Sequence, residues 1–229
     1  EGSIFGLLGP NGAGKSTFIN ILSGLTNKTS GVVNVGGINI DEDAKTVRGN
    51  MGVVPQEINI DPFFTPRQIM EIQAGLYGVR KKFSKNEEIL CELGLSEKQD
   101  AYSRSLSGGM KRRLMVAKAM VHSPAILILD EPTAGVDVEL RQSLWEKIKT
   151  LNSKGVTIIL TTHYLKEAEI LCDEIAVINN GNVIACDSKK NLLNKLDDKE
   201  IFIEFNSAIR EIPQILKKLC ISKTRTSVT

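Results

Sequence analysis

The chain has 229 residues, of which 41% are hydrophobic and 24% charged, and its 29 lysines and arginines nearly balance 27 aspartates and glutamates. This composition is typical of a globular protein with one large domain or two small ones. Because both signs of charge are mixed along the chain, a generally basic nucleic-acid-binding surface is excluded as the main activity. The apolar runs fall well short of the roughly 20 residues that cross a bilayer, so we expect no membrane span in this chain.

The cysteines of the chain are far apart: Cys91, Cys172, Cys186 and Cys220. They form no CxxC pair and no histidine stands near them at metal-ligand spacing, so the sequence supports neither a zinc site nor a disulfide framework. A reducing, cytosolic setting fits this pattern best.

The N-terminal part is predicted to form strand, glycine-rich loop and helix. Residues 3–8 are apolar, and the helix is indicated by apolar residues at helical spacing, namely Phe18, Ile21, Leu22 and Leu25. Two further short strands are expected at residues 31–40 and 51–54, which are bounded by glycine or proline. Residues 57–106 are more polar and helix-prone, which predicts an inserted helical subdomain.

From residue 107 onward, strands and helices alternate. Continuous apolar runs at residues 125–129 and 156–160 are typical of strands buried on both faces, and the intervening segments have helical periodicity. We therefore predict an α/β fold with a mostly parallel sheet. The expected domains are a catalytic core at 1–56 and 107–185, a helical subdomain at 57–106, and a small C-terminal α/β extension at 186–229, with a strand near 201–205 and a helix at 212–219.

A phosphate-binding loop lies between the first strand and helix. The motif GxxxxGK[ST] is matched in full by Gly9, Pro10, Asn11, Gly12, Ala13, Gly14, Lys15, Ser16 and Thr17. Glycines let backbone N–H groups turn toward phosphates, Lys15 would reach the β- and γ-phosphates, and the Ser16 hydroxyl would bind Mg²⁺. The alternative is a glycine-rich turn with a surface lysine. Because Glu1 lies so close to this motif, we expect an N-terminally truncated fragment.

Two acids, Asp130 and Glu131, end the apolar run that follows residue 125. The carboxyl edge of a parallel sheet would place them beside the phosphate loop. There Asp130 would hold Mg²⁺, and Glu131 would polarise the attacking water as a general base. Acids at this position also occur as helix caps or ion-pair partners, which is the alternative.

A second helix start that could hold an anion follows Leu106. Ser107, Gly108 and Gly109 open a helix that carries Lys111, Arg112 and Arg113, and the positive end of a helix attracts negative charge. Taken alone, a serine N-cap with a flexible turn explains the same pattern.

The order of these motifs resembles that of ABC transporter ATPase subunits, over residues 1–188. The matching features are the P-loop, Gln56, residues 106–109, the acid pair, residues 134–137 and His163. The resemblance implies ATP as substrate, Mg²⁺ as cofactor and a head-to-tail dimer in which Ser107 and Gly109 cap the γ-phosphate of the other copy. It also implies that Gln56 contacts Mg²⁺ and the attacking water, that His163 holds the γ-phosphate and that Asp137 passes between the two sites.

Two departures from that family are visible. In that family, residues 106–110 form a segment called the signature, and its fifth position is most often glutamine, where this chain has Met110. We expect this difference to tune the contact with the γ-phosphate rather than abolish it, because backbone N–H groups and Ser107 carry the binding. The adenine-stacking aromatic of the family lies upstream of the P-loop, and Phe5 is too close to serve. Base recognition is therefore not assigned.

Residues 133–137, residues 161–164 and the tail after Gly181 resemble the ATPase subunits of ABC-2 type exporters of drugs, polysaccharides or lipids. This resemblance implies multi-span membrane permease subunits as partners, a second ATPase subunit, and a peripheral position at the cytoplasmic face of the cell membrane, with no nucleic-acid partner. Apolar side chains near Gln56 could contact the permease or be buried in the helical subdomain instead: Ile58, Ile60, Phe63 and Phe64.

Two other functions are alternatives to an exporter subunit. One is a soluble ABC ATPase that acts on ribosomes or DNA, but each motif occurs once and no heptad run separates the P-loop from the signature. The other is a GTPase, but residues 27–30 lack the aspartate that would read guanine, and no switch-type DxxG follows.

Overall fold

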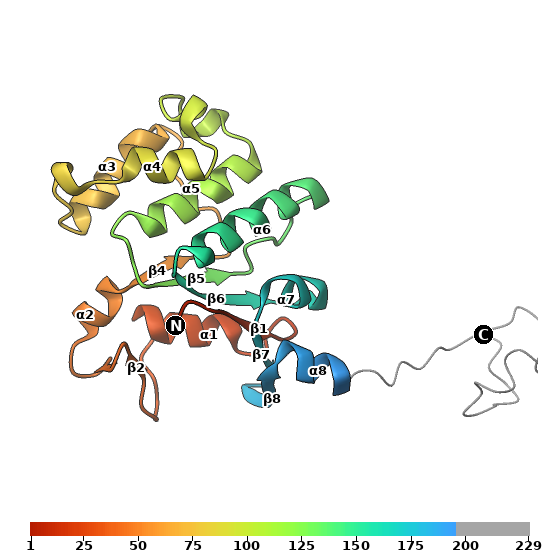
Figure 1. Ribbon diagram of the computed structural model, residues 1–229. Helices are drawn as coiled ribbons and strands as arrows, with labels where there is room; N and C mark the ends of the chain where they lie inside the picture. Colours follow the sequence, from red (N-terminus) through yellow and green to blue (C-terminus); the bar gives the residue numbers. More distant parts are fainter. Residues whose placement is uncertain (196–229) are drawn as a thin grey trace, which may run out of the picture. The chain divides into compact units, whose positions relative to one another are not determined.

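A six-stranded sheet organises the computed structural model, which describes residues 1–195. The strand order is β4-β5-β6-β1-β7-β8, and all neighbours are parallel except the antiparallel pair β7–β8 (Figure 1). The strands are β1 (Ile4–Leu8), β4 (Met51–Val54), β5 (Ile126–Asp130), β6 (Thr157–Thr162), β7 (Glu174–Asn179) and β8 (Asn182–Ser188). The predicted mostly parallel α/β fold is therefore confirmed. The strand and helix expected beyond residue 200 lie outside the described residues.

Eight α-helices fall within the described part of the chain. They are α1 (Lys15–Ser23), α2 (Ala44–Gly49), α3 (Pro66–Leu76), α4 (Asn86–Glu92), α5 (Gly108–Met120), α6 (Val138–Ser153), α7 (Leu165–Leu171) and α8 (Lys189–Lys195). Local sequence explains several starts: Thr65 and Gln68 form a reciprocal capping box at α3, with Pro66 at its first position. No helix among residues 1–195 has the length and apolarity to cross a bilayer.

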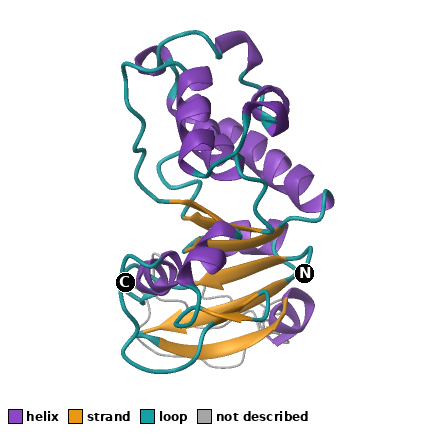
Figure 2. Cartoon of the chain, turned by 90° about the vertical axis from the view of Figure 1, so that its left-hand side faces the viewer, coloured by secondary structure: helices purple, strands orange, loops and turns teal. Residues whose placement is uncertain are grey.

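The region between β4 and β5 is mainly helical, as predicted. Helices α3 and α4 pack against α5, and both Figure 1 and Figure 2 show this group of helices beyond the edge of the sheet that β4 forms. Short 3₁₀ turns connect them at Lys81–Phe83, Ser96–Lys98 and Ser103–Ser105. Because α5 packs on these helices and also on β4, the domain boundaries at residues 56/57 and 106/107 stay a prediction.

Both faces of the sheet are covered by apolar side chains. Leu127 and Leu129 point into the larger core, whereas Ile128 lies in a second core with Ile19 and Leu22 of α1. Alternate residues of a strand point to opposite faces, so two covered faces explain why the sequence of β5 is continuously apolar.

The structure corrects one local expectation and adds two elements. The segment 31–40 forms a two-stranded hairpin, β2 (Asn34–Val35) and β3 (Ile38–Asn39), because adjacent glycines with positive φ make a turn inside it. The helix α2 and the strand β8 were not expected.

The apolar residues that indicated α1 are not all buried. Phe18 and Leu25 are 40% and 78% exposed, whereas Lys15, Ile19 and Leu22 are buried. These three residues follow the i, i+4, i+7 spacing of one helix face. The helix begins at the lysine of the P-loop, and this lysine belongs to its buried face, whereas Leu25 lies beyond the end of the helix.

Candidate functional site

The P-loop has the backbone that its glycines permit. Gly12 and Gly14 have φ of 79° and 104°, values that disfavour side chains. A Cβ on Gly9 would lie 2.3 Å from the carbonyl oxygen of Ile178, so no larger residue fits there. The loop is also tied to the β7–β8 turn, because Gly181 N–H donates to the carbonyl of Ala13 at 2.9 Å.

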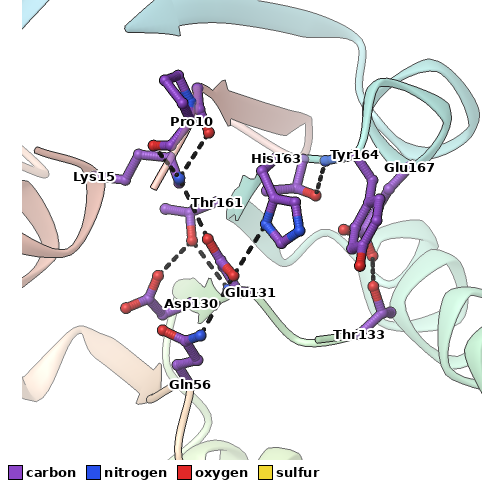
Figure 3. A network of polar contacts seen from close by, with 12 residues as sticks. Pro10, Lys15, Gln56, Asp130, Glu131, Thr133, Thr161, His163, Tyr164 and Glu167 are labelled. Atoms are coloured by element: carbon purple, nitrogen blue, oxygen red, sulfur yellow. Dashed lines mark hydrogen bonds and ion pairs between the residues drawn. The ribbon is translucent and has the colours of Figure 1, made fainter. Parts of the chain in front are cut away.

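Lys15 lies at the start of α1 and is only 4% exposed. Its ammonium group donates to the carbonyl oxygens of Gly9 at 2.7 Å and Pro10 at 3.0 Å, and it lies 3.3 Å from Oε1 of Glu131 (Figure 3). An ammonium group has three donors, and these acceptors match them. The helix N-cap is Gly14, which has no side chain to bond the N–H groups of the first turn.

Glu131 joins four segments of the chain. It follows β5 with a φ of 45°, a strained value for a residue with a side chain. Its Oε2 accepts from Gln56 Nε2 at 3.4 Å and lies 3.1 Å from His163 Nδ1, while Oε1 faces Lys15. Glu131 is 6% exposed. The structure thus brings together Lys15, Gln56, Glu131 and His163, as Figure 3 shows.

Thr161 of β6 holds both acids, and the sequence analysis did not identify it. Its hydroxyl donates to Oδ1 of Asp130 and accepts from the backbone N–H of Glu131 at 3.0 Å. Asp130 pairs in register with Thr161, and Asp130 is 7% exposed. A polar residue near the end of an apolar strand is the signal that could have found it.

A buried glutamate, also missed from the sequence, ties the segment after Glu131 to α7. Glu167 is 1% exposed, and its Oε1 accepts from the Thr133 hydroxyl at 2.7 Å and from Trp145 Nε1 at 2.9 Å. Thr133 is fully buried. This bond links the loop after Glu131 to the helix that follows His163.

The residues proposed as Mg²⁺ ligands are only partly assembled. Ser16 is exposed in the first turn of α1, beside Lys15, and no hydrogen bond joins it to Asp130 within residues 1–195. Hydroxyl and carboxylate oxygens are the ligands that Mg²⁺ prefers, so the donor types fit that ion. The described residues contain no group of three His, Cys, Asp or Glu side chains placed to hold a metal.

Ser107, Gly108, Gly109 and Asp137 lie apart from this cluster. Ser107 caps α5 by accepting from Met110 N at 3.2 Å, and Asp137 caps α6 by accepting from Leu140 N at 2.9 Å. Across the described residues, no hydrogen bond or ion pair joins these residues to the P-loop. A Cβ on Gly109 would meet the side chain of Leu140 at 2.8 Å, so the start of α5 lies directly on α6.

Two of the three basic residues that follow Gly109, Arg112 and Arg113, bind backbone carbonyl groups of the same chain. Arg112 is 5% exposed, and its Nη1 donates to the carbonyl oxygens of Gln56 at 2.6 Å and Pro55 at 3.3 Å. Arg113 donates to the carbonyl oxygens of Leu93 and Gly94. Burial lowers the pKa of both guanidinium groups from the ordinary value. Neither arginine is thus a solvent-facing anion ligand in the way the sequence pattern suggested.

A phosphate loop after β1 and paired carboxylates after β5, in a mostly parallel sheet, define a P-loop nucleotide-binding ATPase fold. A model of the ABC transporter family matches residues 1–134. The chain belongs to this family and is an ATP-binding ATPase domain of it.

Relatives agree with this assignment. The chain is 40% identical over 213 residues to the linearmycin resistance ATP-binding protein LnrL of Bacillus subtilis, covering 92% of this chain and 68% of that protein. It is 45% identical over 187 residues to the Nod factor export ATP-binding protein I of Ralstonia nicotianae, covering 81% of this chain and 58% of the relative. The chain therefore spans little more than half of the Ralstonia protein.

Solved structures show the same fold. One is cbiO1 of Clostridium perfringens, part of the ABC transporter complex cbiONQ, with a TM-score of 0.75 at 27% identity, covering 86% of this chain and 81% of that one. Another is a dimeric ATP-binding cassette in a post-hydrolysis state bound to ADP and Pi, with a TM-score of 0.71 at 26% identity, covering 82% of this chain and 86% of that one.

Proposed function

We propose that this chain powers an ABC-2 type exporter as its ATP-binding and ATP-hydrolysing subunit. The observation that carries the proposal is the placement of Glu131, which contacts the P-loop lysine, Gln56 and His163 at one edge of the sheet. The names of the two relatives support an exporter, because one is a Nod factor export protein and the other is a linearmycin resistance protein.

Lys15 and Glu131 exchange partners in the proposed mechanism. Phosphate oxygens at the P-loop compete with Glu131 for the Lys15 ammonium group, because the carboxylate now lies 3.3 Å from it. Loss of that contact leaves Oε1 of Glu131 as an acceptor for a proton of the attacking water. The Nδ1 of His163 donates to the Glu131 carboxylate in this contact, because a carboxylate can only accept. Its Nε2 would donate to a γ-phosphate oxygen in the doubly protonated imidazolium form, in which both ring nitrogens carry a proton.

Ser16, Asp130 and Gln56 would hold Mg²⁺. When bound, the ion neutralises charge on the phosphates. Two of these three residues are held by neighbours, because Thr161 binds the Asp130 carboxylate and Arg112 binds the backbone carbonyl of Gln56.

A second copy would complete the site. Ser107 and Gly109 are separate from the P-loop cluster of their own chain, and the dimeric structural relative supports assembly of such domains in pairs. In the proposed head-to-tail dimer, Ser107, Gly108 and Gly109 would cap the γ-phosphate of the other copy, and Asp137 would pass between the sites. ATP would then bridge the two copies, and its hydrolysis would remove the bridge.

Membrane permease subunits are the proposed partners, which would place the chain at the cytoplasmic face of the membrane. Ile58, Phe63 and Phe64 are 43%, 70% and 39% exposed, as a partner contact requires. Ile60 packs partly against the main core, so burial explains this side chain better.

Two variants test the catalytic assignment in the intact protein. Glu131→Gln should retain ATP binding, lose most turnover and accumulate an ATP-bound dimer, as seen by ATPase assay and size-exclusion chromatography. Lys15→Ala should instead weaken nucleotide binding itself. A Glu131→Gln protein that hydrolyses ATP at the wild-type rate would contradict the proposal.

Co-purification from native cells tests the partner. A multi-span membrane protein recovered in near-equal amount after mild detergent treatment would support the exporter. Recovery with ribosomes or DNA-bound proteins would support the alternative, a soluble ABC ATPase without a transport role.

A further inference from the structure

Arg112 connects the signature helix to the loop that carries Gln56. It lies on α5, whose N-cap is Ser107, and its Nη1 bonds the carbonyls of Pro55 and Gln56. The side chain of Gln56 then reaches Oε2 of Glu131 at 3.4 Å. A continuous set of contacts thus runs from α5 through the Gln56 backbone to the proposed general base.

The position of Arg112 is energetically expensive. The residue is 5% exposed, no carboxylate pairs with it among the described residues, and its Nε has no partner there. A buried charge without a counter-ion is costly unless strong hydrogen bonds offset the lost hydration. Those bonds go to the two carbonyls of the Gln56 loop, and charge-assisted bonds are roughly twice as strong as neutral ones.

We propose that Arg112 is a positioning residue for ATP hydrolysis, which holds the Gln56 loop so that the Gln56 amide reaches Glu131. Because Arg112 and the signature segment share one helix, it also ties the placement of Gln56 to the placement of Ser107 and Gly109. This inference deepens the proposed ATPase function. Its test by ATPase kinetics rests on that function, whereas its test by hydrogen exchange does not.

Arg113 provides a matched control. It lies on the same helix, and its Nη1 likewise donates to two backbone carbonyls, those of Leu93 at 2.9 Å and Gly94 at 3.4 Å. These carbonyls lie at the end of α4, outside the Gln56 loop. Removing either arginine therefore costs similar bonds, while only Arg112 acts on Gln56.

Hydrogen exchange tests the positioning without any need for turnover. In the full chain, Arg112→Gln should speed amide exchange in peptides around residues 53–60 and leave those around 90–97 unchanged. Arg113→Gln should do the reverse. Equal exchange of residues 53–60 in wild type and Arg112→Gln would overturn the proposal, even if the protein had no ATPase activity.

Steady-state kinetics test the catalytic consequence. Arg112→Gln should lower kcat about tenfold, equivalent to about 1.4 kcal/mol, while the Kd for the fluorescent analogue TNP-ATP changes less than about twofold. Arg112→Lys, which keeps the charge, should recover part of kcat and serves if Arg112→Gln does not fold. Arg113→Gln should keep kcat within about twofold of wild type.

A double-mutant cycle separates action through Gln56 from general destabilisation. If Arg112 acts through Gln56, the variant Gln56→Ala/Arg112→Gln should be no slower than Gln56→Ala alone. Multiplied losses in the double variant, or equal losses in Arg112→Gln and Arg113→Gln, would overturn the proposal. A wild-type chain that binds TNP-ATP but never hydrolyses ATP would instead refute the proposed function.

Discussion

Replacement of Glu131 by glutamine should destabilise the free protein and tighten its binding of nucleotide. The Lys15 ammonium group and Glu131 Oε1 are 3.3 Å apart, and the two side chains are 4% and 8% exposed. At an effective dielectric constant of about 20, their attraction is about 5 kcal/mol. In the variant, the Lys15 ammonium group keeps its hydrogen bonds to the carbonyl oxygens of Gly9 and Pro10. Because these bonds offset part of the lost attraction, we expect the free energy of unfolding to fall by about 2 kcal/mol.

Nucleotide should reverse this loss. When nucleotide binds, phosphate oxygens take the place of the carboxylate at Lys15. The wild-type protein must then break the ion pair between Lys15 and Glu131 and bring phosphate close to a negative carboxylate. The Glu131→Gln variant has neither of these costs. The same 2 kcal/mol then appears as binding free energy, which corresponds to roughly 30-fold tighter binding. A non-hydrolysable ATP analogue isolates this effect from turnover.

Differential scanning fluorimetry and calorimetric titration measure both halves of the prediction. Without nucleotide, the Tm of Glu131→Gln should fall by about 4–8 °C, since about 1 kcal/mol shifts a domain of this size by 2–4 °C. With saturating analogue, most of that difference should vanish. The control is Glu146→Gln, an exposed position on α6, which should change neither quantity. Equal Tm and equal affinity in wild type and Glu131→Gln would refute the reasoning.

Three further changes test the packing of the fold by urea unfolding. Gly52→Ala should cost about 2–3 kcal/mol, because its Cβ would lie 2.3 Å from the carbonyl oxygen of Ala119. Burial lowers the pKa of His122 below the ordinary 6.5, so the protein should lose stability as pH falls below about 6.5, and His122→Gln should remove that pH dependence. Thr133→Val should cost about 1–3 kcal/mol, because the buried carboxylate of Glu167 loses a donor.

Each of these changes has a control or a result that contradicts it. Gly75→Ala, on an open face of α3, should stabilise the protein by about 1 kcal/mol, so equal effects at Gly52 and Gly75 would contradict the steric argument. Equal pH dependence in wild type and His122→Gln would assign the titration to another group. Thr133→Ser keeps the hydroxyl and should be close to wild type.

The sequence was sufficient for those parts of the fold that local patterns determine. The P-loop, the buried strands β5 and β6 and the capped helices follow from motif, apolar runs and N-cap residues. The edge strand β8 was missed because much of it is exposed and its residues show no apolar alternation. The burial of Lys15 in α1 was not predicted, because it depends on the contacts of this charged residue with Gly9, Pro10 and Glu131.

In the candidate site too, some residues were predicted from local patterns and others were not. Lys15, Asp130 and Glu131 were found because each stands at the end of a recognisable element. The contacts of Thr161 and Arg112 were not predicted. The contact of Thr161 depends on strand register, and that of Arg112 depends on the packing of α5, and neither can be derived from local sequence patterns. The roles of all these residues stay predictions until the variants are measured.

Strand register is therefore itself part of the site. In the parallel set β5-β6-β1, Asp130 is opposite Thr161 and Leu8 is opposite Thr162, so the P-loop, the acid pair and His163 leave the sheet at the same level. A slip of β6 by one residue would turn Thr161 to the other face and separate it from Asp130. Substitutions that disturb this register should thus reduce hydrolysis more than nucleotide binding, because the P-loop depends chiefly on its own backbone and on Lys15.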